Sequence, residues 1–301
     1  MCKYDSDTPY LSIVTPTYNR AALLRCCYMS LYAQTCRDFE WIVVDDGSDD
    51  DTEKVMREIT DECELFGISY IKKQNGGKHT ALNAAHGSIR GRFVLILDSD
   101  DTLTDTAVAQ ISEAWRMYDS NSEVGIVTFL RGRSADDPSC VVSDWNVPVD
   151  IMRYKRTCIH SSDCCEVIRT ELFKQYPFPV FEGEKFLSEG ALWNRVSFYY
   201  KCIYINSVVY ICEYLEGGLT RSGKPLRIRN PHGGMYTSNL NMSRKNFFMR
   251  RVKNGLLYVC YGFFAKQHPK EMASNCCAKT LMWCCLPFGY LLYKLWGHKY
   301  G

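Results

Sequence analysis

Apolar residues along this chain gather in short runs, and a segment with helical spacing follows most of them. The runs are four to six residues long and rich in β-branched side chains, which is typical of buried parallel strands. The expected strands are residues 11–14, 41–44, 68–71, 93–97 and 124–129, and the expected helices end near residues 33, 64, 85 and 118. Strands that alternate with helices predict an α/β fold with a doubly wound, mostly parallel sheet.

Carboxylates follow the expected strand at residues 93–97, where Asp98, Asp100 and Asp101 lie within four positions. In open α/β sheets, ligands bind at the carboxyl ends of the strands. Several like charges there are unfavourable unless a cation neutralises them, and oxygen ligands suit Mg²⁺ or Mn²⁺. The strand at 41–44 also ends in acids, and Ser48 or Asp49 is the expected cap of the helix that follows.

Charge is distributed unevenly, although the 301 residues have a net charge of only +2. Residues 221–301 contain 14 Lys or Arg and a single acid, Glu271. Such a segment is expected to contact something anionic. Hydrophobic content of 46% and charged content of 23% are ordinary for a globular protein. We expect no nucleic-acid partner.

The sixteen cysteines include no C-x-x-C spacing that would suggest a zinc site. Residues 1–10 are polar and show no signal peptide, and no run of about 18 apolar residues predicts a membrane-spanning helix. We therefore expect reduced thiols in a cytoplasmic protein. Two nucleotide motifs are also missing, because no G-x-G-x-x-G follows the first strand and the segment at Lys78 lacks the full P-loop pattern.

Four blocks resemble glycosyltransferase family 2: TPTYNR (15–20), VVDDGSDDDT (43–52), LDSDD (97–101) and EVIRTELFKQYPFPVFEGEKFLSEGALWNRV (166–196). The last is similar to bacterial members that build capsule and other surface polysaccharides. The resemblance implies a GT-A fold, a Rossmann-like doubly wound sheet with nucleotide-sugar donors. It covers residues 11–220, so we expect a catalytic domain at 1–220 and a basic, aromatic-rich helical extension at 221–301.

The resemblance also assigns donor-binding roles. Pro16, Thr17 and Tyr18 are expected to hold the base of a UDP-sugar, with Tyr18 near uracil and Asp46 accepting the imide N–H. Lys78 would contact the diphosphate, and Asp98 the nucleotide. Asp100 would touch ribose or metal, and Asp101 would coordinate Mn²⁺ or Mg²⁺ directly in the DXD motif.

An inverting transfer needs a carboxylate to deprotonate the incoming hydroxyl. In the family, this base precedes a helix with a W-x-R-like pattern, which implies Glu189 here. Glu182 and Glu184 are expected to be surface acids of the same loop. Many relatives carry a Glu-Asp pair at this point, and this chain has only Glu189.

Residues 281–296 are apolar and aromatic but are broken by Pro287 and Gly289. Basic residues flank this stretch, so it suits either peripheral contact with the inner face of the plasma membrane or packing on the catalytic domain. The expected function is metal-dependent, inverting transfer from a UDP-sugar to a hydroxyl of a glycan, lipid-linked in related enzymes. The alternatives are a sugar-nucleotide-binding protein without transfer activity and a nucleotidyltransferase.

Overall fold

The computed structural model describes residues 8–142, 145–150, 164–212 and 219–300. The chain divides into two compact units, the first comprising residues 1–177 and 199–213, and the second 178–198 and 214–301. The segment 178–198, which the sequence groups with the catalytic domain, therefore belongs to the same unit as the C-terminal helices.

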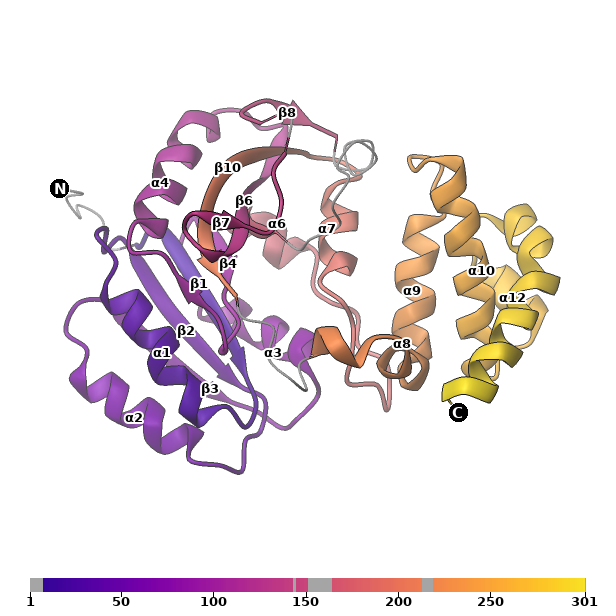
Figure 1. The fold of residues 1–301 in the computed structure, drawn as a ribbon, viewed down its shortest axis with the longest axis horizontal. Helices are drawn as coiled ribbons and strands as arrows, with labels where there is room; N and C mark the ends of the chain where they lie inside the picture. Colours follow the sequence, from indigo (N-terminus) through magenta and orange to yellow (C-terminus); the bar gives the residue numbers. More distant parts are fainter. Residues whose placement is uncertain (1–7, 143–144, 151–163, 213–218, 301) are drawn as a thin grey trace. The chain divides into compact units, whose positions relative to one another are not determined.

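A mixed sheet forms the centre of the first unit (Figure 1). Its strand order is β3-β2-β1-β4-β9-β6-β10-β5, with β7 paired to β6 and β8 paired to β10. The strands are β1 (Leu11–Thr17), β2 (Phe39–Asp45), β3 (Gly67–Lys72), β4 (Phe93–Ile96), β5 (Thr102–Leu103), β6 (Val124–Ser134), β7 (Asp137–Pro138), β8 (Pro148–Val149), β9 (Cys165–Arg169) and β10 (Lys201–Ile211). All five strands expected from the sequence are present.

The first four strands of this order pair in parallel, so their carboxyl ends share one edge of the sheet. β9 then runs antiparallel between β4 and β6, although it follows β6 in the sequence. The sheet is therefore mostly parallel with an antiparallel insertion.

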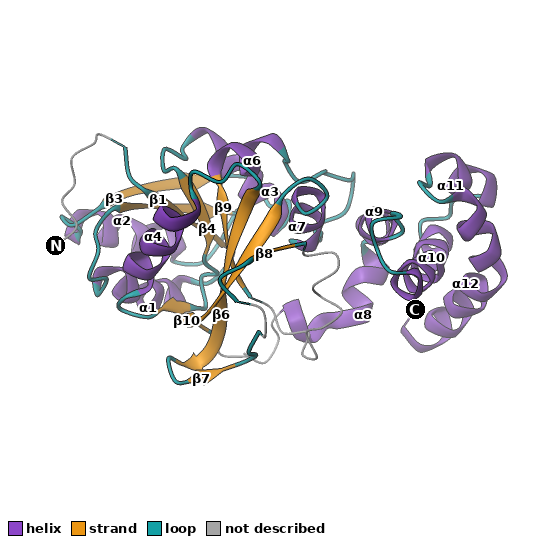
Figure 2. Cartoon of the chain, turned by 90° about the horizontal axis from the view of Figure 1, so that it is seen from above, coloured by secondary structure: helices purple, strands orange, loops and turns teal. Residues whose placement is uncertain are grey.

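Helices cover both faces of this sheet (Figure 2). The helices α1 (Ala21–Tyr32), α2 (Thr52–Glu62) and α4 (Ala107–Tyr118) pack on one face, where they share a core with alternate residues of β1, β2 and β4. The opposite side holds α3 (Lys78–Ala84), the short turn η1 (Ala85–Gly87) and α6 (Thr170–Gln175). Helices on both faces are expected, because successive side chains of a strand point to opposite faces of the sheet and both sets are buried here.

The expected cap of α2 was wrong. The N-cap position is Asp51, and neither Ser48 nor Asp49 caps the helix. Instead, the Asp50 carboxylate accepts hydrogen bonds from the Thr52 N–H at 3.0 Å and the Ala21 N–H at 3.0 Å. One side chain therefore satisfies N–H groups at the starts of both α1 and α2.

The second unit has only helices as regular secondary structure in its described residues. Its helices are α7 (Gly190–Val196), α8 (Leu219–Arg229), α9 (Pro231–Asn241), α10 (Phe248–Phe264), α11 (Pro269–Asn275) and α12 (Lys279–Tyr300). Met242, Val259 and Met272 are fully buried in its core. No helix within the described ranges combines the length and apolarity needed to cross a membrane. All cysteines in those ranges are free thiols.

Candidate active site

Three carboxylates meet in the turn that follows β4. The Leu97 N–H donates to the Val14 carbonyl at 3.0 Å, and the Asp101 N–H closes the turn onto the Asp98 carbonyl at 3.1 Å. Asp98, Asp100 and Asp101 can each direct one carboxylate oxygen into a cluster in which these atoms lie within 4.8 Å of one another. The turn therefore concentrates negative charge at the carboxyl edge of the parallel strands.

Asp101 is the most buried of the three acids, at 8% exposed. Its carboxylate accepts a hydrogen bond from the Tyr210 hydroxyl at 2.7 Å, and the Arg131 guanidinium lies 4.0 Å away. Burial, together with the negative charge of Asp98, raises the pKa of Asp101 to about 7. The two polar partners therefore only partly compensate the crowding of this acid.

Asp98 and Asp100 have cationic neighbours from other loops. Lys78, the first residue of α3, forms an ion pair with Asp98. Burial alone would raise the pKa of Asp98, but the charges of Lys78 and Arg131 outweigh it and lower that pKa below its ordinary value. Arg20, in the loop after β1, lies 3.9 Å from the Asp100 carboxylate.

This donor set fits a hard divalent cation. All three groups supply carboxylate oxygens, which Mg²⁺ and Mn²⁺ prefer to nitrogen or sulfur. Burial and the Asp98 charge raise the pKa of Asp101, and Tyr210 and Arg131 offset only part of the cost of the negative charge on this acid. A divalent cation at this cluster would neutralise that charge.

The expected base-binding residues lie where β1 ends. Pro16 and Thr17 are buried in the strand, and the Thr17 carbonyl accepts the Asp46 N–H at 2.8 Å. Tyr18 follows immediately and is 47% exposed, so its ring is available to a ligand. Asn19, with φ of 52°, links this loop to the next one, because its N–H donates to the Ser48 hydroxyl at 2.9 Å.

Asp46 is buried and holds the loop between β3 and α3. One carboxylate oxygen accepts from Lys73 Nζ at 2.7 Å and the Gly76 N–H at 3.0 Å, and the other accepts from Asn75 at 3.2 Å and the Gly77 N–H at 2.6 Å. Gly77 has φ of 92°, a conformation that favours glycine. The sequence indicates a ligand contact for Asp46 and does not reveal these four internal donors.

Asp45 shapes the adjoining loop. Its carboxylate accepts from the Ser48 N–H at 2.8 Å and from the Tyr70 hydroxyl at 2.6 Å. Burial and the Asp45 charge both raise the pKa of Tyr70, which keeps its hydroxyl protonated as the donor.

Glu189, the candidate base, belongs to the second unit and precedes α7. Its side chain is half-buried, and its carbonyl accepts the N–H groups of Leu192 and Trp193 at 2.9 and 3.2 Å. Glu182 is exposed, as expected, but the expectation for Glu184 was wrong. Glu184 is buried and accepts the N–H groups at the start of α9, from His232 at 2.7 Å and Gly233 at 2.9 Å.

The sequence did not single out Tyr210 and Arg131, which complete the surroundings of Asp101. Tyr210 is fully buried near the end of β10, and Arg131 lies over its ring at 4.1 Å from the centroid. The Tyr210 hydroxyl also accepts the Asp98 N–H at 3.0 Å. The sequence around Tyr210 does not indicate that it contacts Asp101, because most aromatic residues in apolar strands only pack in the core.

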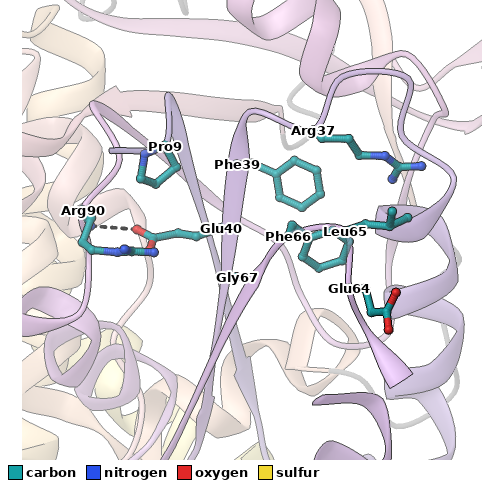
Figure 3. Close-up of a pocket in the computed structure, with 9 residues that line it drawn as sticks. All are labelled: Pro9, Arg37, Phe39, Glu40, Glu64, Leu65, Phe66, Gly67 and Arg90. Atoms are coloured by element: carbon teal, nitrogen blue, oxygen red, sulfur yellow. Dashed lines mark hydrogen bonds and ion pairs between the residues drawn. The ribbon is translucent and has the colours of Figure 1, made fainter. Parts of the chain in front are cut away.

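A separate pocket of about 390 Å³ lies at the amino ends of β2 and β3, the opposite edge from the acids (Figure 3). Among its lining residues, Glu40 forms an ion pair with Arg90 at 2.8 Å and accepts the Ser12 hydroxyl at 2.6 Å. These contacts join the starts of three strands. The carboxylate therefore has a structural role, and the pocket carries no candidate chemistry.

Comparison with known proteins agrees with the motifs. The profile of Glycosyl transferase family 2 matches residues 12–176. The GalNAc(5)-diNAcBac-PP-undecaprenol beta-1,3-glucosyltransferase of Campylobacter jejuni is 36% identical over 109 residues, which are 35% of this chain and 34% of the relative. The chain thus spans about a third of the length of this relative.

Two solved structures share the fold. Residues 1–349 of S. aureus TarS, in complex with UDP-GlcNAc, give a TM-score of 0.64 at 17% identity, covering 96% of this chain and 91% of TarS 1–349. The mannosyltransferase PcManGT of Pyrobaculum calidifontis, in complex with GDP-Man and Mn²⁺, gives 0.58 at 19% identity, covering 97% and 83%. The sheet and its helices therefore have the GT-A architecture of glycosyltransferases. Because the family profile matches more than half of its residues, the chain belongs to glycosyltransferase family 2.

Proposed function

We propose that this protein transfers a sugar from a UDP-sugar to a hydroxyl group of a lipid-linked surface glycan, with inversion at the anomeric carbon. The observation that carries the proposal is the cluster of Asp98, Asp100 and Asp101 at the carboxyl edge of the sheet. A nucleotide diphosphate needs cationic neutralisation there, and three carboxylates can hold the divalent ion that supplies it.

The donor contacts follow from the loops around this cluster. Tyr18 offers an exposed ring to stack on uracil, beside Pro16 and Thr17. The proposed contact of Asp46 with the uracil imide requires at least one of its internal donors to yield or share an oxygen. Lys78 would exchange part of its ion pair with Asp98 for the donor diphosphate.

Asp100 and Asp101, with Asp98, would hold Mn²⁺ or Mg²⁺. The ion would supply positive charge that stabilises the departing diphosphate. The hydrogen bond from Tyr210 orients the Asp101 carboxylate, and the Arg20 guanidinium lies beside the Asp100 carboxylate as its ion-pair partner. These contacts would place the carboxylates before donor binding.

Glu189 supplies the base in the proposed reaction. The acceptor oxygen forms a bond to the anomeric carbon while the bond from that carbon to the β-phosphate oxygen breaks. The Glu189 carboxylate takes the proton of the acceptor hydroxyl, and UDP departs with the bonding electrons. Attack opposite the leaving group inverts the anomeric configuration.

The lipid-linked acceptor is supported by the name of the C. jejuni relative, a glucosyltransferase acting on an undecaprenol-linked glycan. Such a substrate places the reaction at a membrane surface. We therefore include cytoplasmic location and peripheral membrane contact through residues 221–301 in the proposal. The catalytic role of residues 1–220 is part of the same proposal.

The donor part of this proposal is tested by calorimetric titration of UDP and GDP, each with and without Mn²⁺. We expect metal-dependent binding of UDP, loss of that dependence in Asp101→Asn, and wild-type behaviour in the control Asp105→Asn, an exposed acid four residues later. Binding of GDP in preference to UDP would overturn the proposal that uracil is the nucleobase of the donor. This outcome matters because PcManGT was solved with GDP-Man.

The catalytic part is tested by Glu189→Gln with Glu182→Gln as the matched control. We expect Glu189→Gln to retain UDP affinity and to lose turnover on the order of 10²–10⁴-fold, whereas the exposed Glu182 can be replaced without effect. Release of UDP and the anomeric configuration of the product are measured together. Full activity of Glu189→Gln would refute its role as the base.

A further inference from the structure

Helix α12 uses one face to pack against α10. Met282, Cys285 and Gly289 are buried on this inner face. Gly289 permits close contact, because a Cβ atom there would lie 2.6 Å from the Val259 Cβ and 3.0 Å from the Leu256 carbonyl oxygen. The inner face is therefore fully committed to the core of the second unit.

The opposite face of α12 is also apolar, yet it is exposed. Figures 1 and 2 both draw α12 at the outer edge of its unit. At 3.6 residues per turn, five exposed apolar side chains fall within about 140° of the helix circumference, and the exposed Lys294 and His298 lie in the same arc. This outer face consists of Trp283 (45% exposed), Pro287, Phe288 (65%), Leu291 (57%) and Leu295 (59%).

An exposed apolar face of this kind is expected to bind a partner, since a helix that is apolar on both sides is normally buried on both. The charged residues of α12 indicate the chemistry of this partner. Lys279, Lys294 and Lys299 are exposed on α12, and the helix contains no acid. Pairing with the same helix of a second copy would bring lysines toward lysines, whereas an anionic surface complements them.

We propose that α12 lies in the plane of an anionic lipid bilayer, with its outer face inserted at the boundary between headgroups and acyl chains. This position is typical of amphipathic helices with large apolar side chains and lysines. Lys294 supports the geometry, because its ammonium lies 5.5 Å from the Tyr290 ring centroid and 5.7 Å from that of Tyr293. Its aliphatic stem can cover apolar surface while the charge contacts lipid phosphates.

This inference specifies the membrane contact included in the proposed function. The inner face stays on α10 while the outer face enters the lipid, so binding requires no unfolding of the second unit. It also separates lipid binding from the sugar-transfer chemistry, because the outer face contains none of the residues assigned to donor, metal or base.

The test is co-sedimentation of the full chain with vesicles of phosphatidylcholine alone and of equal parts phosphatidylcholine and phosphatidylglycerol. We expect the wild type to bind the anionic vesicles at least ten-fold more strongly. Phe288→Ser/Leu291→Ser should weaken that binding at least ten-fold, because both side chains are inserted. Met29→Ser/Met117→Ser removes two exposed apolar side chains from the first unit and should leave binding unchanged.

Two outcomes would overturn the inference: wild-type protein that binds neither vesicle, or a Phe288→Ser/Leu291→Ser variant that binds as the wild type does. A dimer in analytical ultracentrifugation that this variant dissociates would assign the outer face to a second copy instead. Calorimetric UDP binding, measured on the same samples, keeps the proposals distinct. Failure on vesicles with intact UDP binding overturns the lipid inference and the membrane contact through residues 221–301, and leaves the donor and catalytic parts of the proposed function standing.

Discussion

At the scale of single residues, Asp101 shows how a site suited to a cation destabilises the cation-free protein. Its pKa of about 7 is above the ordinary value of 3.8, because burial and Asp98 disfavour its charged form. Below about pH 4 the carboxyl is protonated in both the folded and the unfolded chain. Between about pH 4 and pH 7 only the folded state keeps the proton, so the free energy of unfolding falls as pH rises through this window.

Asp101→Asn should therefore stabilise the protein in EDTA at pH 8, where the wild type carries the full charge. One pKa unit corresponds to about 1.4 kcal/mol, so the gain should be up to about 4 kcal/mol. The amide oxygen can still accept the Tyr210 hydrogen bond. Urea unfolding at pH 8 and pH 4 measures the effect, and a gain that is equal at both pH values would contradict this origin.

Asp46 differs from Asp101, because four hydrogen-bond donors of the neighbouring loop surround its buried carboxylate. Asp46→Ala should lower the free energy of unfolding by about 2–4 kcal/mol, since it removes the acceptor of the Gly76 and Gly77 N–H groups and the ion-pair partner of Lys73. Asp49→Ala, an exposed neighbour, should change it little. Unfolding curves would show this, and an unchanged midpoint for Asp46→Ala would argue that the carboxylate serves only the ligand.

At the scale of elements, the close approach of α10 and α12 rests on glycine. Gly289→Ala should lower the free energy of unfolding by about 1–3 kcal/mol, because the added methyl overlaps Val259. Gly297→Ala, in the same helix, meets no atom within 4 Å and should raise it by up to about 1 kcal/mol through helix propensity. Thermal unfolding of the two variants measures the difference. Equal effects would mean that the helices can separate at no cost.

The local pattern of apolar and polar residues decides neither the order of the strands in the sheet nor the residue that caps α2. The sequence indicates strands at 93–97 and 124–129 because each is apolar and bounded by polar residues. It does not indicate that β9 lies between them, since an apolar run reports burial and not the identity of its neighbours. The start of α2 shows the same limit, because Ser48, Asp49 and Asp50 are all suitable capping residues and only their positions select Asp50.

At the scale of the whole molecule, charge is divided between the two ends of the sequence. Residues 221–301 carry 14 basic residues and one acid, so the remainder of the chain is acidic overall. Binding to the anionic vesicles should therefore fall at least ten-fold between about 50 and 500 mM NaCl, as the ions screen attraction. Repeating the co-sedimentation at both salt concentrations tests this, and binding that is independent of salt would leave apolar insertion as its sole basis.

The amino-acid sequence by itself determined the alternation of strands and helices from residue 11 to residue 118, the family blocks and the acids after β4. These features are local, since each depends on residues within one turn or one strand. Expectations for the donor contacts, the base Glu189 and the role of the C-terminal extension also come from the sequence and remain predictions.

Only the tertiary structure decided which groups surround the acids. Tyr210 lies 109 residues from Asp101 in the chain, yet their hydrogen bond is 2.7 Å long. Tertiary structure also decided three other features: the four donors around Asp46, the cap that Glu184 forms at α9, and the exposed outer face of α12. Hydrophobic periodicity shows which side of an element avoids water, but the partner that covers it is set by packing between distant segments.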